Sequence, residues 1–136
     1  MSDYTRDMGE TNGRKILVIE DEPPMLDAIV DTLSQNKFTV LTSENGKDGL
    51  DLALREHPDL ILLDIFMPKM DGLSMLEQLR NDAWGHDVPV IILTNLNPEA
   101  DKTIKSILEH KPAYYLIKSN VTLEAIISKI KEVLKM

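Results

Sequence analysis

Polar residues of three chemical kinds, carboxylates, a hydroxyl and an ammonium, stand where short apolar runs of this sequence stop. In chain order they are Glu20, Asp21, Glu22, Asp64, Thr94 and Lys118. Carboxylates can hold a hard divalent cation, and a hydroxyl and an ammonium can hold phosphoryl oxygens. If the fold brings these side chains together, they predict metal-assisted transfer of a phosphoryl group to a carboxylate.

Charge assigns the roles within this set. Carboxylates in one crevice repel, by roughly 4 kcal/mol for a pair about 4 Å apart at an effective dielectric near 20, so the crevice needs a cation. Mg²⁺ fits best because it prefers oxygen ligands and also binds phosphate oxygens, and Mn²⁺ could substitute for it. Thr94 and Lys118 would hold the outer phosphoryl oxygens, and Asp64 would be the nucleophile that forms an aspartyl phosphate.

Five apolar runs are strand candidates, and helical patterns alternate with them. The strands are KILVIE, FTVLT, DLILLD, VPVIILT and AYYLIK. The third and fourth are apolar nearly throughout, which is typical of strands covered by helices on both faces. We expect helices after Pro23, over about 47–57, after Gly72, after Pro98, and over 123–134 with Thr122 as N-cap.

This alternation predicts an α/β fold with a doubly wound five-stranded parallel sheet. It is a flavodoxin-like (βα)5 arrangement, and the strand order should be 2-1-3-4-5 because crossover connections are right-handed. Sheets of this kind bind ligands at the carboxyl ends of their strands. The polar residues above follow these ends, so we expect them to share one site.

The composition is that of an ordinary globular domain of 136 residues. We expect one domain over 14–136, after a polar segment, 1–13, that is a disordered leader or a remnant added for expression. The net charge of −8 disfavours direct binding to nucleic acid or to a membrane, so partners should be proteins or cations. The chain has no cysteine and no signal-peptide or membrane-spanning run, which predicts a cytoplasmic protein.

The segments KILVIEDEPP, DLILLDIFMPKMDG, VIILTN and AYYLIK resemble, in order and separation, the signature segments of response-regulator receiver domains. The resemblance covers about residues 15–136. It implies a two-component phosphorelay in which Asp64 takes a phosphoryl group from a sensor histidine kinase or a histidine phosphotransfer protein. The implied site consists of Glu20, Asp21, Asp64 and the Phe66 carbonyl at the metal, Thr94 and Lys118 at the phosphoryl group, and Tyr115 as the aromatic residue that rotates on switching.

The same resemblance implies a signalling domain that catalyses only its own phosphorylation and slow dephosphorylation. The helix after Pro98, the strand AYYLIK and the last helix should form the output face, for a downstream protein or a homodimer. Phe66 and Leu96 follow Asp64 and Thr94 by two residues. Both are bulky and apolar, so we expect them to exclude water and prolong the phosphorylated state.

Three residues depart from the usual family pattern. Glu20 replaces the frequent aspartate and could bind the metal through water. Asn95 follows Thr94 where a small residue is usual, and it could crowd the path of the threonine. Ser119 replaces a proline after Lys118, so we expect a trans bond there, because a cis bond costs about 2.5–4 kcal/mol before other residues.

Other functions remain open. A phosphatase of the haloacid dehalogenase type would need a second aspartate where Phe66 stands. A flavodoxin-like cofactor binder would need a phosphate loop after the first strand, but EDEPP there would repel phosphate. The third alternative is a receiver-like interaction module that works without phosphorylation, and Asn95 and Ser119 favour it.

Overall fold

The computed structural model describes residues 3–4, 11–65, 67, 70–95 and 101–136. The strands are β1 (Asp3–Tyr4), β2 (Lys15–Ile19), β3 (Thr39–Ser43), β4 (Leu60–Leu63), β5 (Val90–Thr94) and β6 (Tyr114–Ile117). The helices are α1 (Pro23–Gln35), α2 (Gly46–Glu56), α3 (Gly72–Arg80), α4 (Asp101–Glu109), the short 3-10 helix η1 (Lys118–Asn120) and α5 (Leu123–Val133).

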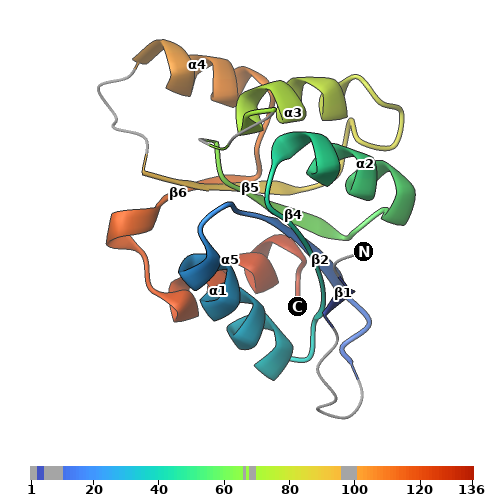
Figure 1. The fold of residues 1–136 in the computed structure, drawn as a ribbon, viewed down its shortest axis with the longest axis vertical. Helices are drawn as coiled ribbons and strands as arrows, with labels where there is room; N and C mark the ends of the chain where they lie inside the picture. Colours follow the sequence, from blue (N-terminus) through green and yellow to red (C-terminus); the bar gives the residue numbers. More distant parts are fainter. Residues whose placement is uncertain (1–2, 5–10, 66, 68–69, 96–100) are drawn as a thin grey trace.

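The strands form one sheet with the order β1-β3-β2-β4-β5-β6, in which β2 to β6 are all parallel (Figure 1). Strands β2 to β6 are the five predicted strands, so the predicted order 2-1-3-4-5 is confirmed. The chain reverses its direction of winding between β2 and β4. That point is where sheets of this kind place their ligands.

The first strand was not predicted. Asp3–Tyr4 pairs antiparallel with β3, opposite Leu41 and Val40. The backbone N–H of Asn12 also donates to the Lys37 carbonyl at 2.9 Å. The prediction of a disordered leader is therefore wrong for Asp3–Tyr4, because the outer edge of β3 offers free backbone groups to which a short extended segment can bind.

Two hydrophobic cores lie on the two faces of the sheet, as the alternation of side chains along each strand requires. In β4, Ile61 and Leu63 face the core beneath α2, α3 and α4, whereas Leu60 and Leu62 face the core beneath α1 and α5. All four side chains are buried. This two-sided burial explains why the central strands are apolar nearly throughout.

Local capping residues set the starts of three helices. Asn45, Asp71 and Thr122 each accept a hydrogen bond from the backbone N–H three residues later, at 2.8, 2.8 and 3.1 Å. The predicted cap at Thr122 is confirmed. Helix α2 starts at Gly46, one residue before its predicted start, because Asn45 is its cap. None of the helices in the described ranges is long and apolar enough to cross a membrane.

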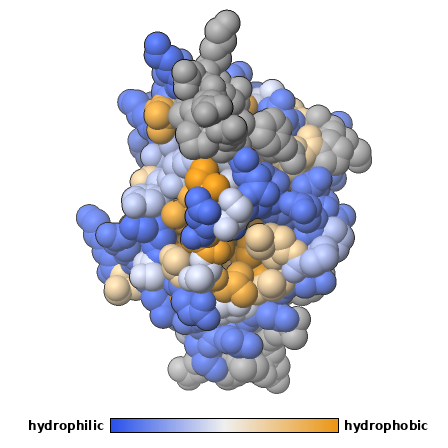
Figure 2. Space-filling view, turned by 90° about the vertical axis from the view of Figure 1, so that its left-hand side faces the viewer, coloured by the Kyte–Doolittle hydropathy of each residue, from blue (hydrophilic) through white to orange (hydrophobic). Residues whose placement is uncertain are grey.

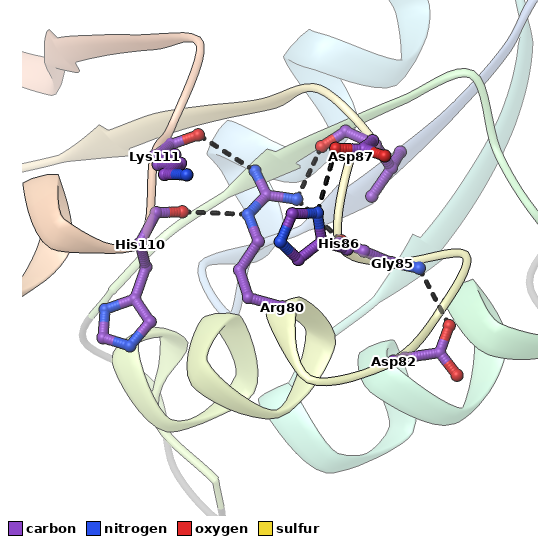
Figure 3. Close-up of polar contacts among 8 residues, drawn as sticks. Arg80, Asp82, Gly85, His86, Asp87, His110 and Lys111 are labelled. Atoms are coloured by element: carbon purple, nitrogen blue, oxygen red, sulfur yellow. Dashed lines mark hydrogen bonds and ion pairs between the residues drawn. The ribbon is translucent and has the colours of Figure 1, made fainter.

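One arginine joins three segments at the amino ends of β5 and β6 (Figure 3). Arg80, the last residue of α3, donates at 2.8 Å to the carbonyls of His110, Gly85 and Val88, and at 3.1 Å to that of Lys111. Burial lowers the pKa of its guanidinium from the usual value, but Arg stays charged in proteins. Arg80 thus holds the end of α3, the turn before β5 and the turn before β6 together.

Candidate functional site

Four carboxylates meet at the carboxyl ends of β2 and β4. Oxygen atoms of Glu20, Asp21, Glu22 and Asp64 all lie within 4.8 Å of one another. The sheet register explains the meeting, since Ile19 pairs with Leu63 and the residues after them are Glu20 and Asp64. Glu20 is 2 % exposed and Asp64 is 5 % exposed. Two of these carboxylates are therefore largely removed from water, where an unpaired charge would be costly.

Lys118 reaches into this cluster from the end of β6. Its Nζ lies 2.6 Å from Glu20 Oε1, 2.8 Å from Glu22 Oε1 and 3.1 Å from Asp64 Oδ2. Its side chain is buried like those of Glu20 and Asp64, whereas that of Glu22 is exposed. One ammonium thus partly offsets the negative charge of three carboxylates.

Burial and pairing shift the titration of both buried partners. Burial raises the pKa of Glu20 to about 7, although the contact with Lys118 opposes this shift. Burial alone would lower the pKa of Lys118, but its close contacts with the carboxylates of Glu20 and Glu22 raise it above the ordinary value. Lys118 therefore stays charged at neutral pH, whereas Glu20 takes up a proton near neutral pH.

Two buried oxygens in this region are available to a ligand. Within the described part of the chain, Thr94 Oγ1 has no hydrogen-bond partner, and the side chain of Thr94 is fully buried. Glu20 Oε1 is close to Lys118, but it makes no well-aligned hydrogen bond there. Buried polar atoms are normally satisfied. A cation beside Glu20 and an acceptor atom beside Thr94 would satisfy these two oxygens.

The donor set fits Mg²⁺. This ion prefers oxygen ligands and is held in many proteins by one or two carboxylates together with water and phosphate oxygens. Glu20, Asp21 and Asp64 offer such oxygens, and soft sulfur ligands are absent from the whole sequence, apart from methionine thioethers. The expected further ligand, the Phe66 carbonyl, lies outside the described residues.

Two glycines allow the segment after Asp64 to pack closely. The Gly72 N–H donates to the Ile65 carbonyl at 2.8 Å, and a Cβ at Gly72 would lie 2.2 Å from the Asp64 carbonyl oxygen. The Gly46 N–H donates to the Met70 carbonyl at 2.9 Å, and a Cβ there would lie 2.1 Å from that oxygen. A larger residue at Gly72 would displace the backbone of Asp64 and Ile65, and one at Gly46 would displace the backbone of Met70.

Residues 16–131 match the family described as response regulator receiver domain. This chain belongs to that family. The match covers both halves of the sheet and all the strand ends described above. The fold and the family predicted from the sequence are therefore confirmed.

Individual relatives agree with this assignment. Protein PilH of Pseudomonas aeruginosa is 40 % identical over 88 residues, which are 65 % of this chain and 73 % of PilH. A probable transcriptional regulator, ycf27 of Cyanophora paradoxa, is 38 % identical over 93 residues, which are 68 % of this chain but only 38 % of that protein. The receiver domain thus spans well under half of this longer relative.

A solved structure with the same fold comes from Pseudomonas aeruginosa PAO1. It is the receiver domain of the sensor histidine kinase PA1611, with a magnesium ion coordinated in the active site cleft. It is 27 % identical, has a TM-score of 0.79, and the alignment covers 88 % of this chain and 96 % of that chain.

The structure of the receiver domain brings most of the expected site residues together. Glu20, Asp21, Asp64 and Lys118 share one cluster. Thr94 pairs with Ile117, the residue before Lys118, at the end of the β5–β6 ladder. Phe66 and Leu96 lie outside the described residues, so their expected control of dephosphorylation stays a prediction.

Tyr115 of the receiver domain lies on β6, opposite Ile92 of β5. Its side chain is half-buried and packs against the core beneath α2, α3 and α4. Burial raises the pKa of its hydroxyl. Its expected rotation on switching stays a prediction.

Sequence reasoning missed two contacts at this site. Glu22 was placed in the crevice, but its bond to Lys118 was not expected. Asn95 was expected to crowd Thr94, whereas its Oδ1 accepts a hydrogen bond from the Ser119 N–H at 3.1 Å. The sequence did carry a signal for the contact between Asn95 and Ser119, since both residues depart from the family pattern at neighbouring strand ends. Among the described residues no peptide bond is cis, so the predicted trans bond at Ser119 is confirmed.

Proposed function

We propose that this receiver domain accepts a phosphoryl group on Asp64 from a histidine kinase or a histidine phosphotransfer protein, with Mg²⁺ bound beside it. The observation that carries this proposal is the meeting of four carboxylates with one buried lysine at the switch point of the sheet. The PA1611 receiver domain, whose cleft holds magnesium, supports the choice of metal. We also place the protein in the cytoplasm, where such donors would meet it.

The chemistry assigns a task to each side chain. An Asp64 oxygen attacks the phosphorus, the new O–P bond forms, and the P–N bond to the donor histidine breaks with its electron pair left on the imidazole. Mg²⁺, when bound, would supply positive charge that offsets the negative charge of the phosphoryl oxygens. Lys118 turns from its carboxylate partners to a phosphoryl oxygen, and the Thr94 hydroxyl donates to another.

A protein donor could approach beside the cluster. An apolar groove of about 450 Å³ lies between the start of α1 and the start of α5, and Glu22 is one of its lining residues. Its other lining residues are Pro24, Met25, Ala28, Val121, Leu123 and Ile126. Apolar clefts of this kind suit the hydrophobic side chains of a partner. A donor seated there would be close to Glu22 and hence to Lys118.

The proposed output face consists of α4, β6 and α5. Leu108 on α4 is 56 % exposed and Tyr114 on β6 is 43 % exposed. Lys129 of α5 places its Nζ 3.8 Å from the centre of the Tyr114 ring. The exposed Leu108 and Tyr114 give this face apolar positions that suit a downstream protein or a second copy of this chain. Figure 2 views the left-hand side of Figure 1, where hydrophobic residues also gather among hydrophilic ones.

Phosphorylation by acetyl phosphate tests the proposal. The wild type should gain one phosphoryl group in the presence of Mg²⁺, and Asp64→Asn, which keeps the size of the side chain, should gain none. Mass spectrometry of the intact protein measures both. If Asp64→Asn is modified at the wild-type rate, the nucleophile is another residue.

Amide hydrogen exchange with and without beryllofluoride, a mimic of the phosphoryl group, tests the output face. Exchange in α4, β6 and α5 should change when the mimic binds. Identical exchange in both states, in a protein that does bind the mimic, would favour an interaction module that works without phosphorylation.

A further inference from the structure

A side-chain hydrogen bond joins the strand ends that carry Thr94 and Lys118. Asn95 follows Thr94, and its Oδ1 accepts a hydrogen bond from the Ser119 N–H at 3.1 Å. The last paired residues of β5 and β6 are Thr94 and Ile117. The bond therefore extends the connection between these two strands beyond the point where their backbone ladder ends.

This bond acts on the peptide group that follows Lys118. Lys118 opens the short helix η1, and its buried Nζ must meet three carboxylates at once. The N–H that Asn95 holds belongs to the peptide plane between Lys118 and Ser119. A proline at position 119 would have no N–H to offer, so the bond requires both departures from the family pattern.

We infer that Asn95 is a positioning residue for phosphoryl transfer: it holds the Lys118–Ser119 peptide plane and so keeps Lys118 Nζ beside Asp64. This inference rests on the proposed function, because it assigns Asn95 a role in the same site. Both Asn95 and Ser119 are exposed, so their bond is not needed to satisfy a buried group. Loss of this bond should therefore change the position of Lys118 Nζ more than it changes the stability of the fold.

Three single substitutions distinguish loss of the hydrogen bond from loss of a side chain. Asn95→Ala removes the acceptor. Ser119→Ala is the matched control, because it removes a hydroxyl but keeps the peptide N–H that donates. Asn95→Asp keeps an acceptor oxygen at the same distance along the side chain, so it serves as the conservative variant.

Three measurements on the full chain decide the inference. In Asn95→Ala the Ser119 amide should exchange about fivefold faster, the Lys118 Nζ resonance in a ¹⁵N spectrum should shift, and beryllofluoride affinity in Mg²⁺ should fall about fivefold, as expected for loss of one net hydrogen bond. Ser119→Ala should stay within about twofold of wild type in each measurement. Asn95→Asp should restore slow exchange of the Ser119 amide.

The opposite results would overturn the inference. These are an unchanged Lys118 resonance and unchanged beryllofluoride affinity in Asn95→Ala, or an equal loss in Ser119→Ala. A fall in melting temperature without any change at Lys118 would also overturn it, since that describes a purely structural bond. If the wild type does not bind beryllofluoride, the proposed function fails, and the Ser119 exchange and the Lys118 resonance still decide whether Asn95 holds the lysine.

Discussion

Each end of the sheet holds one cationic side chain that is at least partly buried. At one end its partners are carboxylate side chains, and at the other end they are backbone carbonyls. Lys118, at the carboxyl ends of the strands, contacts three carboxylates. Arg80, at the amino ends of β5 and β6, donates to four backbone carbonyls (Figure 3). The carboxylates can exchange the ammonium for a metal ion or a proton, whereas the carbonyls are fixed by the chain itself.

The two cations differ in whether their partners can be exchanged while the protein stays folded. At Lys118 the partners are side chains that have other potential ligands, so binding and release can happen without unfolding. At Arg80 every partner belongs to a turn, and loss of the guanidinium would leave four carbonyls, in the turns before β5 and β6, without their donor. We therefore expect substitutions of Lys118 to act mainly on chemistry and those of Arg80 mainly on stability.

The largest effect should follow from Lys118→Met. The rate constant of phosphorylation by acetyl phosphate should fall about 100- to 1000-fold, as when an enzyme loses one donor to a developing negative charge. The variant should also be less stable, because the buried carboxylates lose their cation. Added Mg²⁺ should restore much of that stability by binding the same carboxylates. A rate within about threefold of wild type would contradict the role given to Lys118.

Arg80→Met should lower the free energy of unfolding by about 2–4 kcal/mol, since four carbonyls lose a charged donor at a half-buried position. Mg²⁺ should not restore this loss, and the phosphorylation rate of the folded variant should match that of wild type. Urea denaturation with and without Mg²⁺ measures both effects. The matched control is Arg55→Met, which removes an arginine whose side chain is 58 % exposed and should change little. If Arg80→Met and Arg55→Met lose equal amounts of the free energy of unfolding, Arg80 has no special structural role at its end of the sheet.

The phosphorylated state should persist for minutes to hours, because Phe66 and Leu96 offer no hydrogen bond to a water in line with the Asp64–phosphorus bond. The double substitution Phe66→Asn with Leu96→Glu should shorten this lifetime about tenfold, which corresponds to about 1.4 kcal/mol in the barrier. Loss of the phosphoryl group can be followed by mass spectrometry after the donor is removed. A wild-type lifetime of seconds would contradict this prediction.

Mg²⁺ affinity should depend on pH through Glu20. Burial raises the pKa of Glu20 in the folded protein from 4.5 to about 7, so the folded protein holds this proton more tightly than the unfolded chain does. The contribution of Glu20 to stability without metal therefore falls as the pH rises from about 4.5 to about 7. Mg²⁺ needs the deprotonated carboxylate, and its affinity should rise about tenfold between pH 6 and pH 8.

Calorimetric titration with Mg²⁺ at several pH values measures this dependence. Glu20→Gln, which removes the titrating group and keeps the size of the side chain, should bind more weakly and with a flatter pH profile. An equal slope in wild type and Glu20→Gln would assign the proton to another group.

Much of the fold and the centre of the site could be predicted from the sequence. Apolar runs of four to six residues separated by helical patterns predicted the five parallel strands and their order. Because parallel strands end at one edge, the same pattern predicted that Glu20, Asp64 and Lys118 would meet. The cap at Thr122 followed from local spacing alone, since its bond is to Ala125 in the same turn.

Other contacts depend on how distant segments pack. Arg80 binds carbonyls that lie up to 31 residues away along the chain, and Lys118 binds Glu22 across 96 residues. The Asn95 bond to Ser119 joins the residue after β5 to the helix η1, and Asp3–Tyr4 joins the sheet through the outer edge of β3. No periodicity in the sequence marks these pairs.

The sequence by itself determined the elements, their order and the chemical types gathered at the carboxyl edge, because those follow from spacing of a few residues and from the handedness of the chain. Only the tertiary structure decided which carboxylates Lys118 touches, which carbonyls Arg80 holds, and that Asn95 reaches the Ser119 amide. Such contacts require side chains to meet within about 3 Å, and backbone positions set by the whole packed core decide whether they can.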